Sequence, residues 1–513
     1  MSDHHRRRFL SEVGRGMLVA SVGSALATDL GIVGAWADEV SSELSFGKHE
    51  PLVVLMQETP VDRLQPLVVE QIRQGTDLRT LTTAAALANA RTFGGQDYTG
   101  YHTMMALMPA LEMSLQMPTA QRALPVLKVL YRNTDTIQSK GGRKAEVLRP
   151  VAAKPAPARG GGQQLRKQVH AADLQAAEAT LAGLTDARAR RAFNALQRIV
   201  QDDINVHRVV LAWRAWDMLR LTGAEHAHTM LRQSVRFCVD AEQERIRNGR
   251  AEPAIRGVLP ALLDQYKLAG RAPGDRQADD QWVSHLAQTI YNGTREQAAE
   301  AAAAALAEGF SPEQVGEAMS LAAAQLVLHD PGQSEVTPGR PKGSVHGASV
   351  GVHASDAASA WRHIGRVTNS RNQIASLIVG AYHTAGQAGG LHDKPYPHAE
   401  HVEAVRTSDS KELLGELESC IRGNDQGRAC ALVERYAKLE QPVRPVFDVL
   451  LKYAVSEDGA LHAEKYFRTV SEEYDGTRDR FRWQHLVALA RVTASEYGQP
   501  APGHAQAVEL LSG

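Results

Sequence analysis

The feature that most limits how this sequence can fold is an internal repeat of alanine-rich, helix-patterned segments. Residues 290–330 and 421–462 both begin with Ile, a polar-Gly turn and an Ala-containing apolar run, followed by a second break and another apolar run. Residues 72–102 and 174–228 are more distant relatives of this pattern. Internal self-similarity of this kind is typical of proteins built from stacked supersecondary units. We therefore expect about four copies of one helical module, or at least two related halves.

Within each copy the apolar residues follow helical rather than strand spacing. The runs "EQAAEAAAAALAEGF" and "RPVFDVLLKYAV" place them at i, i+3, i+4 and i+7 without sustained alternation. Aromatic residues make up 5% of the chain and alanine is abundant, which favours close-packed helices over sheets. Ser311 followed by Pro312 is typical of a helix N-terminus. The expected fold is all-α, with tandem helical modules stacked as helical hairpins.

A Pro-, Ala- and Gly-rich stretch that begins at Val151 separates the first copy from the rest and predicts a linker. With the repeats, it divides the chain into the following expected segments: a signal peptide (1–37), module 1 (38–150), the linker (151–164), module 2 (165–275), module 3 (276–405) and module 4 (406–513).

The N-terminus has the order of features expected of an export signal. Arg6–Leu10 resembles the R-R-x-F-L core of a twin-arginine signal, a Gly/Ala-rich apolar stretch follows, and Ala35–Ala37 offers a cleavage site. Asp29 interrupts the apolar run and argues against a membrane-spanning helix. The alternative is a disordered basic tail before an amphipathic helix. We expect a periplasmic or otherwise exported protein, with the twin-arginine machinery as a partner and no transmembrane helix in the mature chain. Export in the folded state favours a cofactor loaded before translocation.

Charge and cysteine content exclude two classes of protein. The 57 Lys and Arg balance 58 Asp and Glu, so nothing indicates nucleic acid as a partner. The cysteines are odd in number and fit no metal-binding spacing, so the chain is not a disulfide scaffold. Cys420 and Cys430 remain able to pair in principle.

Histidines recur at comparable positions of the four copies and often stand near carboxylates. We expect these module histidines to be candidate ligands of a transition metal such as iron or zinc, because imidazole and carboxylate suit these ions; they are His102, His228, His346 and His462.

A second set of histidines is expected to be catalytic, namely His346, His353 and His207. His346 and His353 are seven residues apart, which would place them two turns apart on one helix face. Imidazole titrates near neutrality, so these residues also suit acid/base work without a metal. The structural alternative is that each histidine caps or packs a helix and recurs through shared ancestry alone.

Other catalytic motifs are missing from the sequence. It contains no G-x-S-x-G elbow, no Gly-Lys-Ser/Thr phosphate loop and no dinucleotide-binding glycine pattern after a strand. Glu-x-x-His occurs once, at Glu225, whereas a ferritin-like di-iron site needs it twice.

Three segments resemble the questin oxidase-like family of helical proteins: "YHTMMALMPALEM", "NVHRVVLAWRAWDMLRLTGA" and "SVHGASVGVHASDAASAWRHI". The resemblance implies an oxygen-dependent oxidation without a nucleotide fold. Carried over position by position, it marks His102, Asn205, His207, His346 and His353. The sequence departs from the family pattern where Tyr101 stands before His102 instead of Asn, and where Asn205 lies two residues before His207.

Two functions are therefore expected from the sequence. One is an exported oxidoreductase or metal-dependent enzyme that acts on a small molecule through clustered histidines. The other is a non-enzymatic helical-repeat protein that binds a partner. Convergence of at least three histidines with a carboxylate in one buried pocket would favour the enzyme, and scattering along the edges of the helical hairpins would favour the scaffold.

Overall fold

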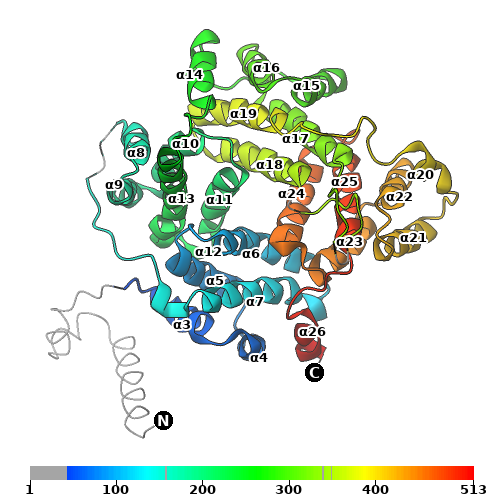
Figure 1. Cartoon of the computed structure of the whole chain (residues 1–513), viewed down its shortest axis with the longest axis horizontal. Helices are drawn as coiled ribbons and strands as arrows, with labels where there is room; N and C mark the ends of the chain where they lie inside the picture. The colour runs from blue at the N-terminus through cyan, green and yellow to red at the C-terminus, as the bar shows by residue number, and fades with distance from the viewer. Residues whose placement is uncertain (1–42, 156, 158, 338–339, 348, 513) are drawn as a thin grey trace, which may run out of the picture. The chain divides into compact units, whose positions relative to one another are not determined.

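The computed structural model describes residues 43–512 except 156, 158, 338–339 and 348 (Figure 1). The expected signal peptide lies outside the described residues. Phe46 onward forms one compact unit, so the four predicted modules are parts of one body rather than separate domains. Within the described part, helices dominate and β-contacts are limited to isolated bridges such as Arg276 with Phe310. The all-α prediction is confirmed.

The α-helices, in chain order, are α3 (Glu50–Glu58), α4 (Val61–Arg73), α5 (Leu78–Phe93), α6 (Tyr98–Gln116), α7 (Leu124–Ser139), α8 (Gly161–His170), α9 (Leu174–Ala187), α10 (Ala189–Val200), α11 (Val206–Asp217), α12 (Leu219–Thr222), α13 (Ala227–Arg247), α14 (Ile255–Gln265), α15 (Asp280–Asn292), α16 (Arg295–Ala307), α17 (Pro312–His329), α18 (Val350–Val367), α19 (Ser370–Ala385), α20 (Ala399–Ala404), α21 (Ser410–Arg422), α22 (Gln426–Lys438), α23 (Arg444–Ser456), α24 (His462–Gly476), α25 (Trp483–Glu496) and α26 (His504–Ser512).

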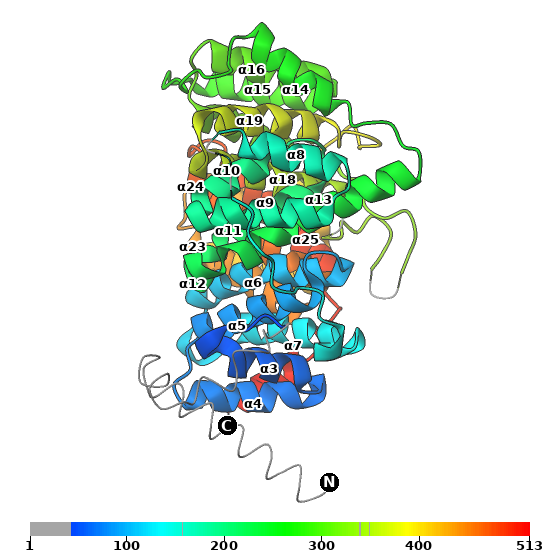
Figure 2. The ribbon, with the colours of Figure 1, turned by 90° about the vertical axis from the view of Figure 1, so that its left-hand side faces the viewer.

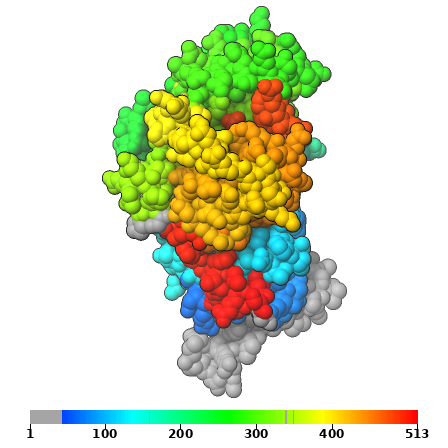
Figure 3. Space-filling model, turned by 90° about the vertical axis from the view of Figure 1, so that its right-hand side faces the viewer, coloured from blue at the N-terminus to red at the C-terminus, as the bar shows by residue number. Residues whose placement is uncertain are grey.

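In the compact unit that starts at Phe46, helices pack both on their chain neighbours and on helices that are distant in the chain, such as α16 on α19 and α22 on α25. Among the chain neighbours, α5 packs on α6, α6 on α7, α17 on α18 and α18 on α19. Figure 2 shows α14, α15 and α16 at one end of this unit and α3 and α4 at the other, with α6 and α11 between them. The segment that carries α20 and α22, yellow to orange in Figure 3, covers part of an outer face, and the red C-terminal segment lies beside it.

Four helices form a closed ring at the centre of the unit. α6 packs on α11, α11 on α18, α18 on α24, and α24 on α6 again (Figure 1). α6 is apolar on nearly every side, and such a helix has to be buried. α18 approaches its neighbour closely through Gly351, where an added Cβ would lie 2.7 Å from the Cα of Val327. Gly351 thus sets α18 against α17, while the contacts of the ring hold α18 beside α11 and α24.

Several local predictions can be compared with this fold. Ser311 is the N-cap of α17 with Pro312 at its first position, as expected. The predicted linker 151–164 is too long, because α8 already begins at Gly161. The cysteines are buried free thiols, so Cys420 and Cys430 do not pair. Among the described residues, no helix combines the length and apolarity that a membrane span requires.

Candidate metal centre

Four histidines from the four central helices face one another. The ring centroids of His102 and His207 are 4.7 Å apart, those of His207 and His353 5.4 Å, those of His353 and His462 5.3 Å, and those of His462 and His102 5.1 Å. The Nε2 atoms of His353 and His462 are 3.2 Å apart. We call these four residues the histidine cluster.

Each member of the histidine cluster sits in the first five residues of its helix, so the helix starts decide where the imidazoles lie. Asp97 caps α6 by accepting the amide hydrogen of Gly100 at 2.8 Å. Asn205 caps α11 by accepting those of His207 and Arg208 at 2.9 and 3.2 Å. Ser349 caps α18 in the same way. The sequence thus places a capping residue directly before three of the four helices that carry the histidines.

The ring nitrogens of His102 and His462 are oriented as those of metal-binding histidines usually are. The Nδ1 atom of His102 lies 2.7 Å from the carbonyl of Tyr98, and that of His462 lies 3.0 Å from the carbonyl of Ala460. A carbonyl can only accept, so both Nδ1 atoms carry hydrogen and both Nε2 atoms keep a lone pair. Within the described part of the chain, the buried Nε2 atoms of His102 and His207 have no hydrogen-bond partner. A hydrogen bond from Nδ1 to a carbonyl or carboxylate is the usual way in which proteins orient Nε2 toward a metal.

The spacing of the histidine cluster fits four imidazoles around one ion. An imidazole nitrogen lies about 2.1 Å from an ion such as Zn²⁺, which puts neighbouring ring centres of a four-coordinate site about 4.5–5.2 Å apart. The four observed spacings, 4.7 to 5.4 Å, are at or just above this range. As they stand, no three donor atoms of the histidine cluster lie within 4.8 Å of one another, so the rings would have to turn toward the centre to bind an ion.

Burial keeps the histidine cluster neutral. It lowers the pKa of His102 to about 2, that of His207 to about 4 and that of His353 to about 3, and it lowers the pKa of His462 well below its ordinary value. In all four cases the positive charge of Lys465 is the next largest cause. Neutral imidazole is the form that binds metals.

Lys465 is a buried cation beside the histidine cluster. It follows His462 by three residues on α24 and therefore shares its helix face. Burial lowers its pKa to about 8, against the opposing charges of Asp356 and Glu464. Its ammonium group makes no hydrogen bond or ion pair within the described part of the chain, and Glu464 pairs instead with Lys128 at 2.6 Å. A proton on this amine is therefore weakly held.

The backbone before His462 is strained. Gly459, Ala460 and Leu461 have φ of 49°, 47° and 66°, and left-handed conformations cost roughly 1–2 kcal/mol for residues with a Cβ. These residues form the 3₁₀ turn η5 (Gly459–Leu461) that feeds α24. Strain of this kind persists where the surrounding structure fixes it and is concentrated at functional sites.

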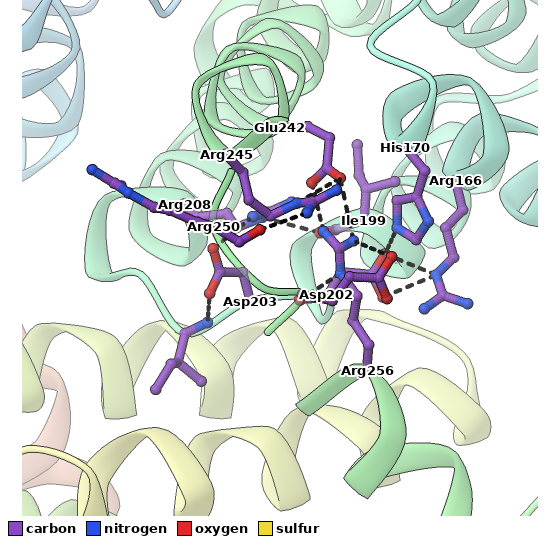
Figure 4. A network of polar contacts seen from close by, with 12 residues as sticks. Arg166, His170, Ile199, Asp202, Asp203, Arg208, Glu242, Arg245, Arg250 and Arg256 are labelled. Atoms are coloured by element: carbon purple, nitrogen blue, oxygen red, sulfur yellow. Dashed lines mark hydrogen bonds and ion pairs between the residues drawn. The ribbon is translucent and has the colours of Figure 1, made fainter. Parts of the chain in front are cut away.

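A polar network holds the turn that precedes His207 (Figure 4). Arg166 Nε and His170 Nε2 both contact the carboxylate of Asp202 at 2.7 Å. Arg208 donates to the carbonyl of Ile199 at 3.0 Å and to the carboxylate of Asp203 at 3.2 Å. These contacts fix residues 201–205 between α10 and α11 and thereby the position of the α11 start.

The histidine cluster has aromatic and polar neighbours. Tyr98, which is 58% exposed, lies over His102 with ring centroids 4.3 Å apart. Tyr101 stacks on the same imidazole and also contacts Phe237. On another side, His346 lies 6.1 Å from the ring of His462. His346 also lines a cavity of about 340 Å³ together with Asp330, Ser344 and Leu391.

The structure brings together some predicted site residues and separates others. His102 and His462, predicted as ligands, and His207 and His353, predicted as catalytic, form the histidine cluster. His346 lies beside it, with Nε2 3.7 Å from Glu496. The prediction that His346 and His353 share a helix face is wrong, because α18 begins at Val350.

The predicted ligand His228 lies apart from the histidine cluster. It stands near Arg232 and Glu178, and burial lowers its pKa to about 4. Glu225 belongs to a separate 3₁₀ turn before α13, so the Glu-x-x-His pattern does not lie on one continuous helix. Lys465 and Glu496 were not predicted. The spacing His-x-x-Lys was a usable signal for Lys465, whereas nothing local marks Glu496.

A second group of donors lies on α20. Among the described residues, His398, Glu400 and His401 are the three donors whose atoms lie within 4.8 Å of one another. The Nδ1 atom of His401 accepts the amide hydrogen of His398 at 3.0 Å, and Glu400 has a side chain that is 72% exposed. This group is therefore explained by capping of a short helix.

Comparison with family models, curated proteins and solved structures finds no match for this chain.

Proposed function

We propose that this protein is a non-haem metal oxidoreductase in which His102, His207, His353 and His462 hold a single transition-metal ion. The observation that carries the proposal is the convergence of four neutral imidazoles from four helix starts, with two Nδ1 atoms bonded to carbonyls and two buried Nε2 atoms without partners in the described part of the chain. Each buried nitrogen without a partner costs free energy. Packing alone would therefore favour apolar side chains at these four positions.

The choice of metal follows from the donors. Four imidazoles and no thiolate suit iron, zinc or copper, and the resemblance to the questin oxidase-like family favours iron. Bound iron would supply one-electron chemistry toward dioxygen, which amino-acid side chains lack. Because all four ligands are neutral, the ion would keep its full charge and attract an anionic substrate group.

The neighbouring residues have roles that do not depend on the metal's identity. His346, held near Glu496 at the edge of the cavity, is placed to move a proton to or from a substrate. Lys465 with a pKa of about 8 can release its proton when a cation enters the histidine cluster, which limits the electrostatic cost of loading. Tyr98 and Tyr101 shield one side of His102 from solvent.

We also propose that the protein is exported folded. The R-R-x-F-L resemblance supports this, and a histidine cluster assembled from residues 102 to 462 exists only in the folded chain. Metal loading in the cytoplasm would then precede translocation. The convergence of the histidines also favours an enzyme over a binding scaffold, for which scattering along helix edges was expected.

The test is elemental analysis of the chain from Asp38 onward, purified without chelator and reconstituted with Fe²⁺ without air. The variants are His102→Ala/His353→Ala and, as a matched control with a buried imidazole outside the histidine cluster, His228→Ala. We expect about one iron per chain in the wild type and the control, and loss in the double variant with circular dichroism unchanged. X-ray absorption should report nitrogen ligands. No stoichiometric metal in the wild type, or equal metal in all three proteins, would overturn the proposal.

A further inference from the structure

Three arginines from three helices meet away from the histidine cluster, next to Asp202. They are Arg166 of α8, Arg198 of α10 and Arg371 at the start of α19. Burial and then the charge of Arg166 lower the pKa of Arg198. Burial and then the charge of Arg198 lower the pKa of Arg371 to about 9. The guanidinium groups are thus close enough to repel one another, and we call these three residues the arginine cluster.

The negative charge near the arginine cluster is too small to balance it. Asp202 is the carboxylate that opposes the charges of Arg198 and Arg371. Its oxygens are already engaged, since Arg166 Nε lies 2.7 and 2.9 Å from them and His170 Nε2 lies 2.7 Å from one (Figure 4). One carboxylate beside three guanidinium groups leaves an excess of two positive charges.

Many hydrogen-bond donors of the arginine cluster have no partner among the residues that the structure describes. Arg166 uses only Nε on Asp202, and Figure 4 shows its terminal nitrogens turned away from that carboxylate. Arg198 makes no hydrogen bond or ion pair with any part of the chain that the structure describes. Arg371 bonds through Nη1 alone, to the side-chain oxygens of Gln201 and Asn372. Free guanidinium nitrogens on three side chains are the donors that an anion with several oxygens requires.

Packing holds the arginine cluster in place. The stem of Arg198 passes under Gly162, where an added Cβ would lie 2.9 Å from its Cγ. Asn372, which positions Arg371, donates to the carbonyl of Asn194 on α10 at 2.9 Å. Side chains that are already ordered lose less entropy when they bind a ligand.

We propose that Arg166, Arg198 and Arg371 bind a phosphate-class dianion, either free or as the phosphate group of a larger molecule. The excess of two positive charges matches a dianion, and the free nitrogens match tetrahedral oxygens. The start of α19, where Arg371 is the second residue, adds its partial positive charge. Gln201 and Asp202 contact the arginine cluster and also belong to the turn that precedes His207. A bound anion would therefore connect α8, α10 and α19 to this turn. The proposal does not depend on the histidine cluster holding a metal.

Calorimetric titration and thermal unfolding of the chain from Asp38 onward test the arginine cluster with inorganic phosphate as the probe. Sodium chloride at equal ionic strength is the reference. The variants are Arg198→Gln and Arg198→Gln/Arg371→Gln, and Arg190→Gln, an exposed arginine on the same helix, is the matched control. We expect saturable phosphate binding with a raised Tm in the wild type and control, weakened about ten-fold or more for each cluster arginine removed.

Several results would overturn the anion site. They are a phosphate effect no larger than that of chloride, equal binding by the double variant, and equal binding of malonate, which lacks tetrahedral oxygens. Glycerol phosphate distinguishes the two sources, because competition with phosphate indicates that the site accepts esters and its absence restricts the site to the free ion. Circular dichroism of each variant reports folding independently of the anion and of any metal.

Discussion

The buried histidines should make the metal-free protein lose stability steeply as pH falls from 7 to 5. Four of them are at most 4% exposed, namely His102, His383, His462 and His485. Burial lowers the pKa of His102 to about 2 and that of His383 and His485 to about 4, and it lowers the pKa of His462 well below 6.5. In the unfolded chain all four have a pKa near 6.5. The unfolded state therefore binds more protons below that pH, and stability falls as pH falls.

The size of this effect follows from the difference in bound protons. At pH 5, each histidine kept neutral in the folded state costs about 2 kcal/mol relative to pH 8. Four such residues cost about 8 kcal/mol, which is comparable with the whole stability of a typical domain. Carboxylates with lowered pKa, such as Glu473 at about 2, lose their stabilising charge below their unfolded pKa near 4.5, a separate and more acidic range. Between pH 5 and 7 the histidines should dominate.

The assay is urea unfolding of chelator-treated protein at half-unit steps from pH 5 to 8, followed by tryptophan fluorescence. In His102→Phe, the slope of the free energy of unfolding between pH 5 and 6 should fall by about 1.4 kcal/mol per pH unit, because one fewer proton is taken up on unfolding. His285→Phe changes an exposed histidine and should leave the slope unaltered. A flat profile in the wild type would refute the burial of these four histidines in the neutral form, including His102 and His462 of the histidine cluster.

Three further substitutions test the placement of the histidines. Asn205→Ala removes the cap of α11 and should cost about 1 kcal/mol in thermal or urea unfolding and lower the iron content, while Asn205→Asp should retain both. Gly347→Ala would place a Cβ against that of His462, closer than two carbon atoms can approach, so iron content should fall at unchanged helicity; full occupancy would mean that this contact does not position His462. Ala460→Gly relieves a left-handed residue and should raise the free energy of unfolding by about 0.5–1 kcal/mol, whereas a loss would show that the turn is unstrained.

The fold class was predictable because its determinants are local. Alanine-rich runs such as residues 296–310 have helical spacing and few β-branched residues, and capping residues such as Asn205 mark where helices begin. The end of the linker was misplaced because α8 opens with Gly161 and Gly162. These residues suggest a flexible stretch, yet Gly161 allows the close approach of α8 to Leu184 and Gly162 allows its close approach to Arg198.

The candidate site was predictable only in its residue types. All four members of the histidine cluster were named from the sequence, but His228 was grouped with them because it occupies a similar position in its repeat. A similar position within a predicted repeat does not determine whether the start of a helix faces the centre of the unit. Lys465 was overlooked because lysine is rarely buried. Its burial results from the packing of α24 against α6 and α18, which the sequence does not reveal.

The sequence by itself determined the helices, their starting residues and the supply of imidazoles, because helix propensity, capping and periodicity act over a few neighbouring residues. Tertiary structure alone decided which imidazoles meet, which nitrogens of the described residues lack a partner and which arginines are left unbalanced. These depend on contacts between residues as far apart as His102 and His462, and side-chain packing across the ring of α6, α11, α18 and α24 sets them.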